Sequence, residues 1–435
     1  MSPPDAPDGS TASPTPAGVD AGIRMRLRRL GAAGTARRAA HPPGPDRAAA
    51  PLIPRPTPAR PASAAGDGVE VVRARYSLAH RHGHSAIGES LDAIAAHGEE
   101  IDPGRTVWLD TETTGLAGGT GTYVFLVGLA SLGEGGIVIE QFLLRRLSAE
   151  GRFLAMLQER LARARRLVTF NGQRFDWPLL EARFVLARLR PTPVDAHTDL
   201  IHSARRLWHR VLGTHRLSAI EAAVLGAPRA GDIQGWEIPQ VYVHYLRTAD
   251  RGALEPVLAH NRTDLVALLG LHAAVARVLS NPPGPHGPID WEGAGVLLGR
   301  RGDHAQAARC FERALDEADR REEWIQGNPF DGRDRWRILR RCVREYRLMG
   351  AARRVRERWE KEVSRPPQRD RYHAQALMEV SRAREAALDD RGAGVAAAEA
   401  LAIARSLDGS RAPCPPLFVE RLRRRVARLA AGGRR

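Results

Sequence analysis

The 435-residue chain has little cysteine, a single lysine and few aromatic residues. Its three cysteines, Cys310, Cys342 and Cys414, are far apart and form no CxxC pair, which disfavours a disulfide framework and a cysteine zinc site. No apolar run approaches the roughly 18 residues that a membrane span needs. The start, MSPPDAPDGSTASP, has neither the basic nor the apolar region of an export signal. We therefore expect a cytoplasmic protein without a membrane segment.

The positive charge of the chain is almost entirely arginine. The formal net charge is +16, Lys361 is the only lysine, and most of the excess lies at the two ends, with a net +5 in residues 1–66 and a net +7 in residues 411–435. Guanidinium groups suit bidentate contacts with phosphate, which favours a polyanionic partner. A GC-rich genome is the simpler explanation for the choice of arginine over lysine.

Composition divides the chain into four parts. Residues 1–66 are rich in Pro, Ala and Gly and predict a disordered basic tail. Within it, residues 22–40 could form a short basic helix on a polyanion. Residues 67–280 alternate between β-like and helical patterns, as an α/β domain does. Residues 281–288 hold four prolines and predict a linker, and residues 289–435 read as helical hairpins.

The α/β part contains five candidate strands and four candidate helices. The strands are expected at 69–76, 105–110, 122–132, 136–144 and 165–171. The helices are expected at 148–163, 177–189, 215–225 and 253–279.

Residues 295–318 have small and apolar residues at spacings that resemble a tetratricopeptide repeat, with Gly302-Asp303 at the turn. Two less regular repeats follow at 336–360 and 373–405. The alternative is an ordinary α-helical bundle without repeats. Either arrangement predicts packing or the binding of a protein partner. No aromatic-rich platform for single strands is evident in the chain, of which aromatic residues make up only 5%.

Three stretches could carry chemistry. In VWLDTETTGL (107–116), Asp110 and Glu112 would lie on the same face of a strand, so a shared proton or bound cations must relieve their repulsion. In LVTFNGQRFDWPLLEARF (167–184), Asp176 lies near a helix start, where it could cap the helix. In EPVLAHNRTDLVALLGLHAAV (255–275), His260 and Asp264 have i, i+4 spacing on one helix face.

Taken in order, the four acids Asp110, Glu112, Asp176 and Asp264 resemble the three exonuclease motifs of the DEDD (DnaQ-like) nucleases. The stretches GTGTYVFLVGLA, after the first motif, and HTDLIHSARRLW, after the second, resemble the YprB-type branch of that superfamily. Members of this branch often carry tetratricopeptide-like helices. The resemblance implies an RNase-H-like fold, in which a mixed sheet is flanked by helices, and a two-metal 3′-5′ exonuclease. The four acids would hold Mg²⁺ or Mn²⁺, the ions that activate water and steady the leaving oxygen in phosphodiester hydrolysis.

The same resemblance assigns nucleotide contacts to a further set of residues. They are Thr113, Thr114, Gly115, Asn171 and Phe175, of which the last could equally be a core residue.

His260 departs from the pattern of this superfamily. The residue that orients the attacking water lies four positions before the last Asp in the tyrosine subclass and five before it in the histidine subclass. Here the histidine has the tyrosine spacing from Asp264. His260 therefore either serves as the general base in place of the tyrosine or does not reach the water, because a shift of one helical position turns a side chain by about 100°.

Other histidines and acids allow simpler explanations. Asp199, in HTDLIHS with His197, could support a metal shell or the local backbone, and the latter is favoured. The cluster of His80, His82 and His84 is more typical of a polar loop or a phosphate contact than of a metal site.

Two functions follow. The first is a metal-dependent exonuclease acting on DNA or RNA, with the arginine-rich ends holding the polyanion. The second is a catalytically weak adaptor that binds nucleic acid on an RNase-H-like scaffold and proteins through its helices.

Overall fold

A computed structural model describes residues 68–115, 121–281, 287–324, 332–365, 370–410 and 412–432. The expected disordered tail at 1–66 lies outside the described residues.

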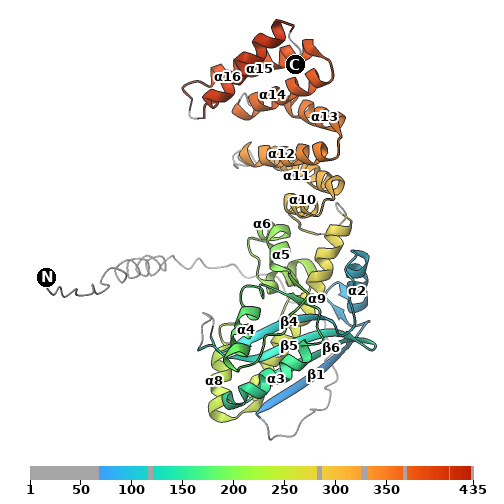
Figure 1. Ribbon diagram of the computed structural model, residues 1–435, viewed down its shortest axis with the longest axis vertical. Helices are drawn as coiled ribbons and strands as arrows, with labels where there is room; N and C mark the ends of the chain where they lie inside the picture. The colour runs from blue at the N-terminus through green and yellow to red at the C-terminus, as the bar shows by residue number, and fades with distance from the viewer. Residues whose placement is uncertain are drawn as a thin grey trace, which may run out of the picture. The chain divides into compact units, whose positions relative to one another are not determined.

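Six strands form one mixed sheet in the order β1-β6-β5-β4-β7-β8 (Figure 1). β1, β6, β5 and β4 run antiparallel to their neighbours, whereas β4, β7 and β8 are parallel. The strands are β1 (Val69–Ser77), β4 (Thr106–Thr113), β5 (Val124–Gly133), β6 (Gly136–Leu144), β7 (Arg166–Thr169) and β8 (Ala196–Asp199). A short hairpin, β2 (Arg81–His82) with β3 (Ser85–Ala86), lies outside this sheet.

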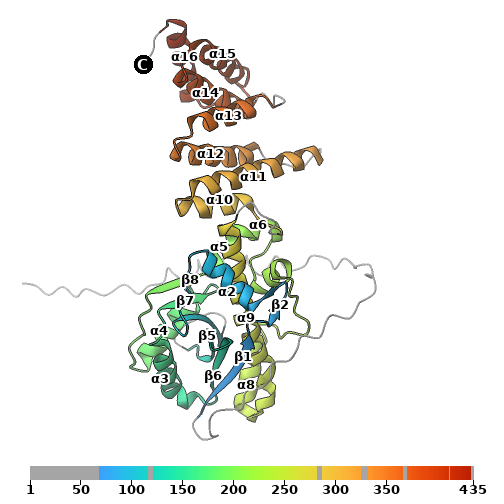
Figure 2. The same cartoon turned by 90° about the vertical axis from the view of Figure 1, so that its right-hand side faces the viewer.

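Helices cover both faces of the sheet, and alternate residues of each strand supply two cores (Figure 2). On β4, Trp108 packs with α2 (Ile87–Ala96) and α9 (Glu255–Ser280). Its neighbour Leu109 packs on the other face with α3 (Glu150–Leu161) and α4 (Asp176–Leu186).

The remaining elements of the α/β part are short, apart from α8. They are η1 (Leu147–Ala149), α5 (Ile201–Leu207), α6 (His209–Leu212), α7 (Leu217–Ile220), η2 (Glu221–Leu225), α8 (Ile238–Thr248) and η3 (Arg251–Leu254).

α9 is the central helix of this part. Together with η3 it is long and apolar enough to cross a membrane by length and composition alone, which the search for apolar runs did not anticipate. Most of its apolar window, 72%, is buried inside the protein, so packing against the sheet explains its apolarity.

Helices follow one another along the chain beyond the proline-rich stretch. They are α10 (Trp291–Arg300), α11 (His304–Trp324), α12 (Gly332–Leu348), α13 (Ala352–Val363), α14 (Arg371–Ala386), α15 (Asp390–Ser406) and α16 (Pro416–Ala430). α10 and α11 form the expected hairpin, in which Gly302 has a positive φ of 84° at the turn. α10 also packs against α5, where a Cβ on Gly293 would lie 1.8 Å from the carbonyl oxygen of Arg206.

This architecture confirms the expected fold class, a mixed sheet flanked by helices and followed by a helical region. The five expected strands are present, but β8, α2 and α8 were not expected.

Candidate acidic active site

The carboxyl half of β4 is open on one side. β4 pairs with β7 only over Thr106–Trp108, whereas its pairing with β5 continues to Thr113 through an irregularity after Glu112. Asp110 and Glu112 lie on this half, on the α9 face of the sheet that Trp108 also faces. The strand therefore presents both carboxylates beside α9, at a place where the neighbouring strand has ended.

A buried amide holds Asp110. Asn261 of α9 is fully buried, and its Nδ2 donates to Oδ2 of Asp110 at 2.8 Å. Nε2 of Gln141, on β6, donates to Oδ1 of Asn261 at 2.8 Å and to the carbonyl of Leu258 at 2.9 Å. Arg262 donates to the side-chain oxygen of Gln141 at 3.1 Å. These bonds fix the orientation of one Asp110 oxygen through a side chain that cannot turn away.

Gly128 makes room for this amide. It lies opposite Asp110 on β5, and a Cβ at this position would lie 2.2 Å from Oδ1 of Asn261 and 2.7 Å from a methyl group of Leu265. Only glycine allows α9 to approach the sheet this closely beside the acids.

Asp176 enters the site from the other face. It is the first residue of α4 rather than the residue before it, so the expected capping position belongs to Phe175, which makes no side-chain cap. Its Oδ1 accepts a hydrogen bond from the hydroxyl of Thr111, whose side chain lies on the α4 face of β4. The cap interpretation is therefore wrong, and Asp176 is tied to β4 between the other two acids.

Asp264 shares its surroundings with a histidine and an arginine. Nε2 of His260 lies 3.5 Å from Oδ2 of Asp264, and Nδ1 of His260 lies 2.8 Å from Oδ2 of Asp232. The guanidinium of Arg229 contacts Oδ1 of Asp264, Oδ2 of Asp232 at 3.0 Å and Oε2 of Glu221 at 2.6 Å. Arg229 thus places a fixed positive charge against the last of the four acids.

Burial and neighbouring charges raise the pKa of all four acids. Burial and then the charges of Asp264 and Asp176 raise the pKa of Asp110 well above its usual range. Burial and then Asp110, Asp264 and Asp176 do the same for Glu112. Burial also raises the pKa of Asp176 and of Asp264, and in Asp264 the charges of His260 and Arg229 counteract it. The effect of Asp176 and Asp264 on Asp110 and Glu112 requires that the four carboxylates are close together.

This donor set suits hard divalent cations, because carboxylate oxygens are their preferred ligands. Within the described ranges, no three His, Cys, Asp or Glu side chains already form a metal shell. The reason is visible in the contacts: Asn261, Thr111 and Arg229 each hold one of the acids. The four carboxylates therefore suit divalent cations, and the guanidinium of Arg229 already supplies one positive charge beside Asp264.

The expected nucleotide-contact residues lie on the loops around the acids. The hydroxyl of Thr113 donates to the carbonyl of Gly115 at 2.8 Å, and Thr114 exchanges backbone and side-chain bonds with Tyr123. Asn171 has a positive φ of 68° directly after β7. Phe175 is 54% exposed, so the alternative of a core residue is wrong.

Asp199 supports backbone. Its two oxygens accept from the N–H groups of Asn171, Gln173 and Ile201 at 2.6, 3.0 and 3.1 Å, which holds the loop that leads to Asp176. His197 packs beside it, 2.8 Å from the hydroxyl of Thr169. The favoured structural reading of Asp199 is consistent with these bonds.

The three neighbouring histidines take separate partners. His80 lies edge-on to Tyr76, His82 contacts Glu221 at 2.9 Å, and the ring of His84 packs against Gly226. They do not converge on one point, in agreement with the preference for a polar loop.

Sequence reasoning missed Arg229, Asp232, Gln141, Asn261 and Gly128. The first two lie outside any periodic stretch, where nothing in the chain singles them out. Asn261 had a usable signal, since it lies three residues before Asp264 and so shares its helix face.

The region that holds this site is similar to known proteins. Residues 107–276 match the model of the RNase_H superfamily. A curated relative, "Uncharacterized protein YprB" of Bacillus subtilis (strain 168), is 30% identical over 263 residues, which cover 56% of this chain and 63% of the relative. The chain therefore spans less than two thirds of that relative. The region matched by the superfamily model, residues 107–276, holds all four acids.

Proposed function

We propose that the chain is a metal-dependent nuclease, a 3′-5′ exonuclease of the DEDD type. One observation carries this proposal: Asp110, Glu112, Asp176 and Asp264 arrive from three elements at one place, where the charges of Asp176 and Asp264 raise the pKa of Asp110 and of Glu112. Burying four interacting carboxylates costs stability, which a cation site would explain.

The four acids would hold the cations. Two ions of Mg²⁺ or Mn²⁺, when bound, activate a water and stabilise the leaving oxygen of the phosphodiester. Asn261 orients Asp110, Thr111 orients Asp176, and both bonds leave a second carboxylate oxygen for a ligand.

His260 is the proposed general base. Because a carboxylate only accepts hydrogen bonds, the contact with Asp232 assigns the proton of a neutral imidazole to Nδ1. Nε2 then keeps its lone pair on the side of Asp264, where it can take a proton from the attacking water. His260 lies four residues before Asp264, which is the spacing of the water-orienting residue in the tyrosine subclass. This spacing directs Nε2 toward the acids.

Side chains around the acids would bind the terminal nucleotide. The exposed ring of Phe175, next to Asp176, offers a stacking surface for a base. The turn at Thr113–Gly115, closed by its own hydrogen bonds, brings backbone close to the same place. Asn171 would contact the nucleotide from the loop after β7.

A specific observation favours the alternative, an adaptor with little turnover. Arg229 already neutralises part of the acidic cluster through Asp264, Asp232 and Glu221, so part of the charge is balanced without a cation. In that case nucleic acid binds, but divalent cations change neither stability nor substrate.

Cleavage of end-labelled strands tests the proposal. Single-stranded DNA and RNA labelled at the 5′ end, incubated with Mn²⁺, should shorten progressively, and a 3′ label should be released at once. Asp110→Asn and His260→Ala should abolish or strongly reduce cleavage. Asp195→Asn, an identical change at a 68% exposed carboxylate, should leave it unchanged. Intact strands in every condition, with nucleic acid still bound, would favour the adaptor.

A further inference from the structure

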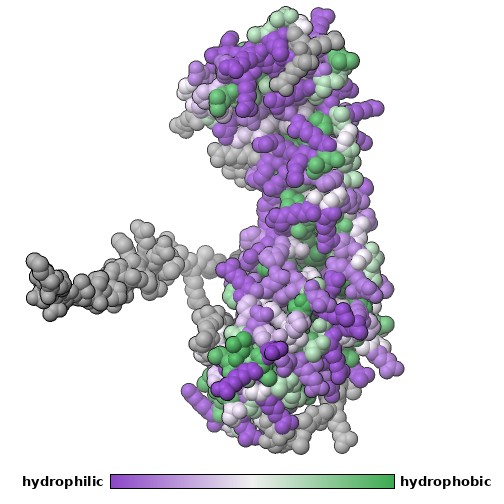
Figure 3. Space-filling model, in the orientation of Figure 1, coloured by the Kyte–Doolittle hydropathy of each residue, from purple (hydrophilic) through white to green (hydrophobic). Residues whose placement is uncertain are grey.

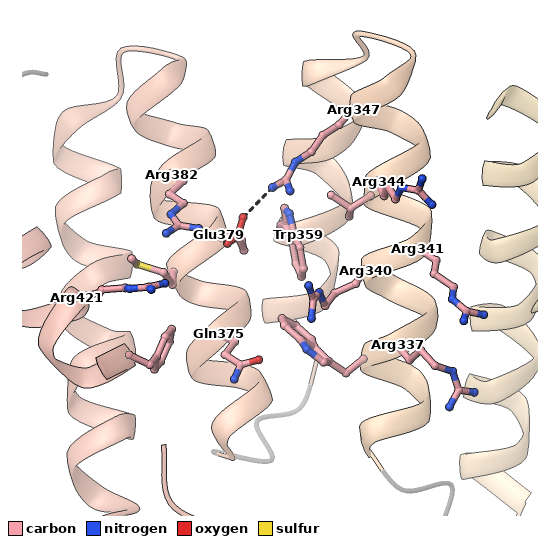
Figure 4. Close-up of a pocket in the computed structure, with 14 residues that line it drawn as sticks. Arg337, Arg340, Arg341, Arg344, Arg347, Trp359, Gln375, Glu379, Arg382 and Arg421 are labelled. Carbon is pink, nitrogen blue, oxygen red and sulfur yellow. Dashed lines mark hydrogen bonds and ion pairs between the residues drawn. The ribbon is translucent and has the colours of Figure 1, made fainter. Parts of the chain in front are cut away.

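The helical region contains a groove that the acidic site does not explain. Its cavity of about 780 Å³ lies between α12, α13, α14 and α16 (Figure 4). We term it the arginine groove, and its lining residues include Trp336, Arg340, Arg347, Trp359, Arg382 and Arg421. The surface of this region is strongly hydrophilic (Figure 3).

The groove carries uncompensated positive charge. Seven arginines and one glutamate, Glu379, line it. Arg337 pairs with Asp334 and Glu292, and Arg341 pairs with Glu292. Arg344 lies 3.8 Å from Glu345, so these three charges are compensated. Arg347 and Arg382 share Glu379 at 2.8 and 2.6 Å, so one of these two charges remains.

Two further arginines have no partner at all among the described residues. Arg340 and Arg421 are exposed, they come from different helices, and no ion pair or hydrogen bond joins either side chain to the rest of the described structure. In Figure 4, Arg340 and Arg421 approach the space between α12 and α14 from opposite sides. Two free guanidinium groups that face one cavity are available to bind an anion such as phosphate.

Aromatic side chains lie beside these charges. Trp336 is half-buried, and its ring lies 5.3 Å from that of Trp359, which forms part of the floor. The indole N–H of Trp359 has no hydrogen-bond partner in the described structure. Phe418, also half-buried, adds a third ring from α16. Folding thus brings together a platform that the scattered aromatic residues of the sequence did not reveal.

The groove continues into a second cavity. Met378, Arg382 and Arg421 line both, and the second cavity, of about 880 Å³, adds Arg424, Arg425 and Arg428. The latter two are held by Glu385, whereas Arg424 pairs with Glu420 on its own helix. Arginines outnumber acidic residues in both cavities, since Glu379 lines the first and Glu385 and Asp390 line the second. Adjoining cavities with an excess of arginine suit an extended polyanion better than a compact ligand.

We infer that the arginine groove binds single-stranded nucleic acid, with Arg340 and Arg421 on phosphates and the half-buried rings beside bases. Arginine favours phosphate because its planar fork matches two oxygens and can also stack on a base. A single strand, unlike a duplex, exposes bases to aromatic rings. The choice of ligand rests on the proposed nuclease function, for which the groove would hold the strand from which nucleotides are removed.

Binding measurements on the full chain test the inference. The Asp110→Asn variant, which prevents turnover, is titrated against fluorescein-labelled oligo-dT and oligo-U of 12 nucleotides, with anisotropy as the readout. Adding Arg340→Ala and Arg421→Ala should weaken binding about tenfold, because charge-assisted bonds to phosphate are lost. It should also reduce the slope of log affinity against log salt by about 1.4, since each single-strand phosphate contact contributes roughly 0.7.

A matched control separates the groove from net charge. Arg353→Ala with Arg354→Ala removes the same two charges from exposed positions of α13 outside both cavities and should leave affinity unchanged. Equal binding by the groove variant and its parent would refute the inference. So would loss of binding to a poly-glutamate peptide with oligonucleotide binding intact, which would indicate an acidic protein partner.

The nuclease proposal is tested separately from the groove. Hydrolysis of a p-nitrophenyl ester of thymidine monophosphate by the otherwise wild-type chain reports on the acids alone, because this substrate offers no strand to the groove. Absence of this hydrolysis, with groove-dependent oligonucleotide binding retained, would overturn the nuclease and leave the groove. Unchanged hydrolysis, with binding independent of Arg340 and Arg421, would overturn the groove and leave the nuclease.

Discussion

Arg229 should act as an internal substitute for a metal cation. Its side chain is only 10% exposed and contacts three carboxylates, of which Glu221 is almost fully buried. In Arg229→Met the methylene stem is largely preserved, while Asp232, Asp264 and Glu221 lose their shared positive charge. Removing one partner of a buried ion pair costs about 3–5 kcal/mol.

The lower end of that range applies here. His260 continues to contact Asp232 and Asp264, and His82 continues to contact Glu221, so none of the carboxylates is left wholly alone. We expect a loss of about 3 kcal/mol in the absence of divalent cations. If Mn²⁺ binds the acids, a concentration of 100 times its Kd returns about 2.7 kcal/mol and nearly cancels the loss.

Thermal unfolding in EDTA and in Mn²⁺ measures both quantities. The control is Arg183→Met, because Arg183 is 6% exposed and holds Glu150 through two bonds outside the acidic cluster. The control should lose comparable stability, and Mn²⁺ should not restore it. If Mn²⁺ restores both variants equally, or neither, Arg229 does not stand in for a cation.

Three other changes probe the same acids. At pH 7 in EDTA, Asp110→Asn should raise the unfolding temperature, because a carboxyl whose folded pKa is raised destabilises the fold above its unfolded pKa. The gain should vanish below about pH 3, where the carboxyl is protonated in both the folded and the unfolded state. Gly128→Ala should cost about 3 kcal/mol in urea unfolding by displacing Asn261, whereas Gly151→Ala, in open helix, should not destabilise. Asn261→Leu should leave Asp110 without its amide, lowering kcat in cleavage assays while oligonucleotide affinity is retained.

The strongest sequence signals came from residues whose neighbours in the chain share their environment. The apolar runs of β5 and β6 are buried on both faces, and so they are visible without knowledge of the fold. β8 has the sequence AHTD and was missed because only its end is buried. α8 was missed because its apolar residues are interrupted by polar ones at a helix face that packs against Phe125.

The residues of the acidic site divide in the same way into those that the sequence revealed and those that it did not. The four acids could be identified because each lies in a recognisable local context, next to a strand end or within a helix. Their partners could not, because Arg229 and Asp232 reach α9 from a loop about 30 residues earlier in the chain. The arginine groove is a still clearer case, since Arg340 and Arg421 meet only when α12 and α16 pack around α14.

The arrangement around Asp110 bears on the choice between nuclease and adaptor. A scaffold would gain from replacing a buried carboxylate with a neutral side chain, because burial and neighbouring charges oppose its ionisation. Instead Gln141, Asn261 and a glycine opposite the strand are all arranged to hold that carboxylate in one orientation. A fixed orientation contributes nothing to charge balance, but it is what a metal ligand requires. The effect of Asn261→Leu on kcat therefore separates the two functions: an adaptor would tolerate the change once folded, and a nuclease would not.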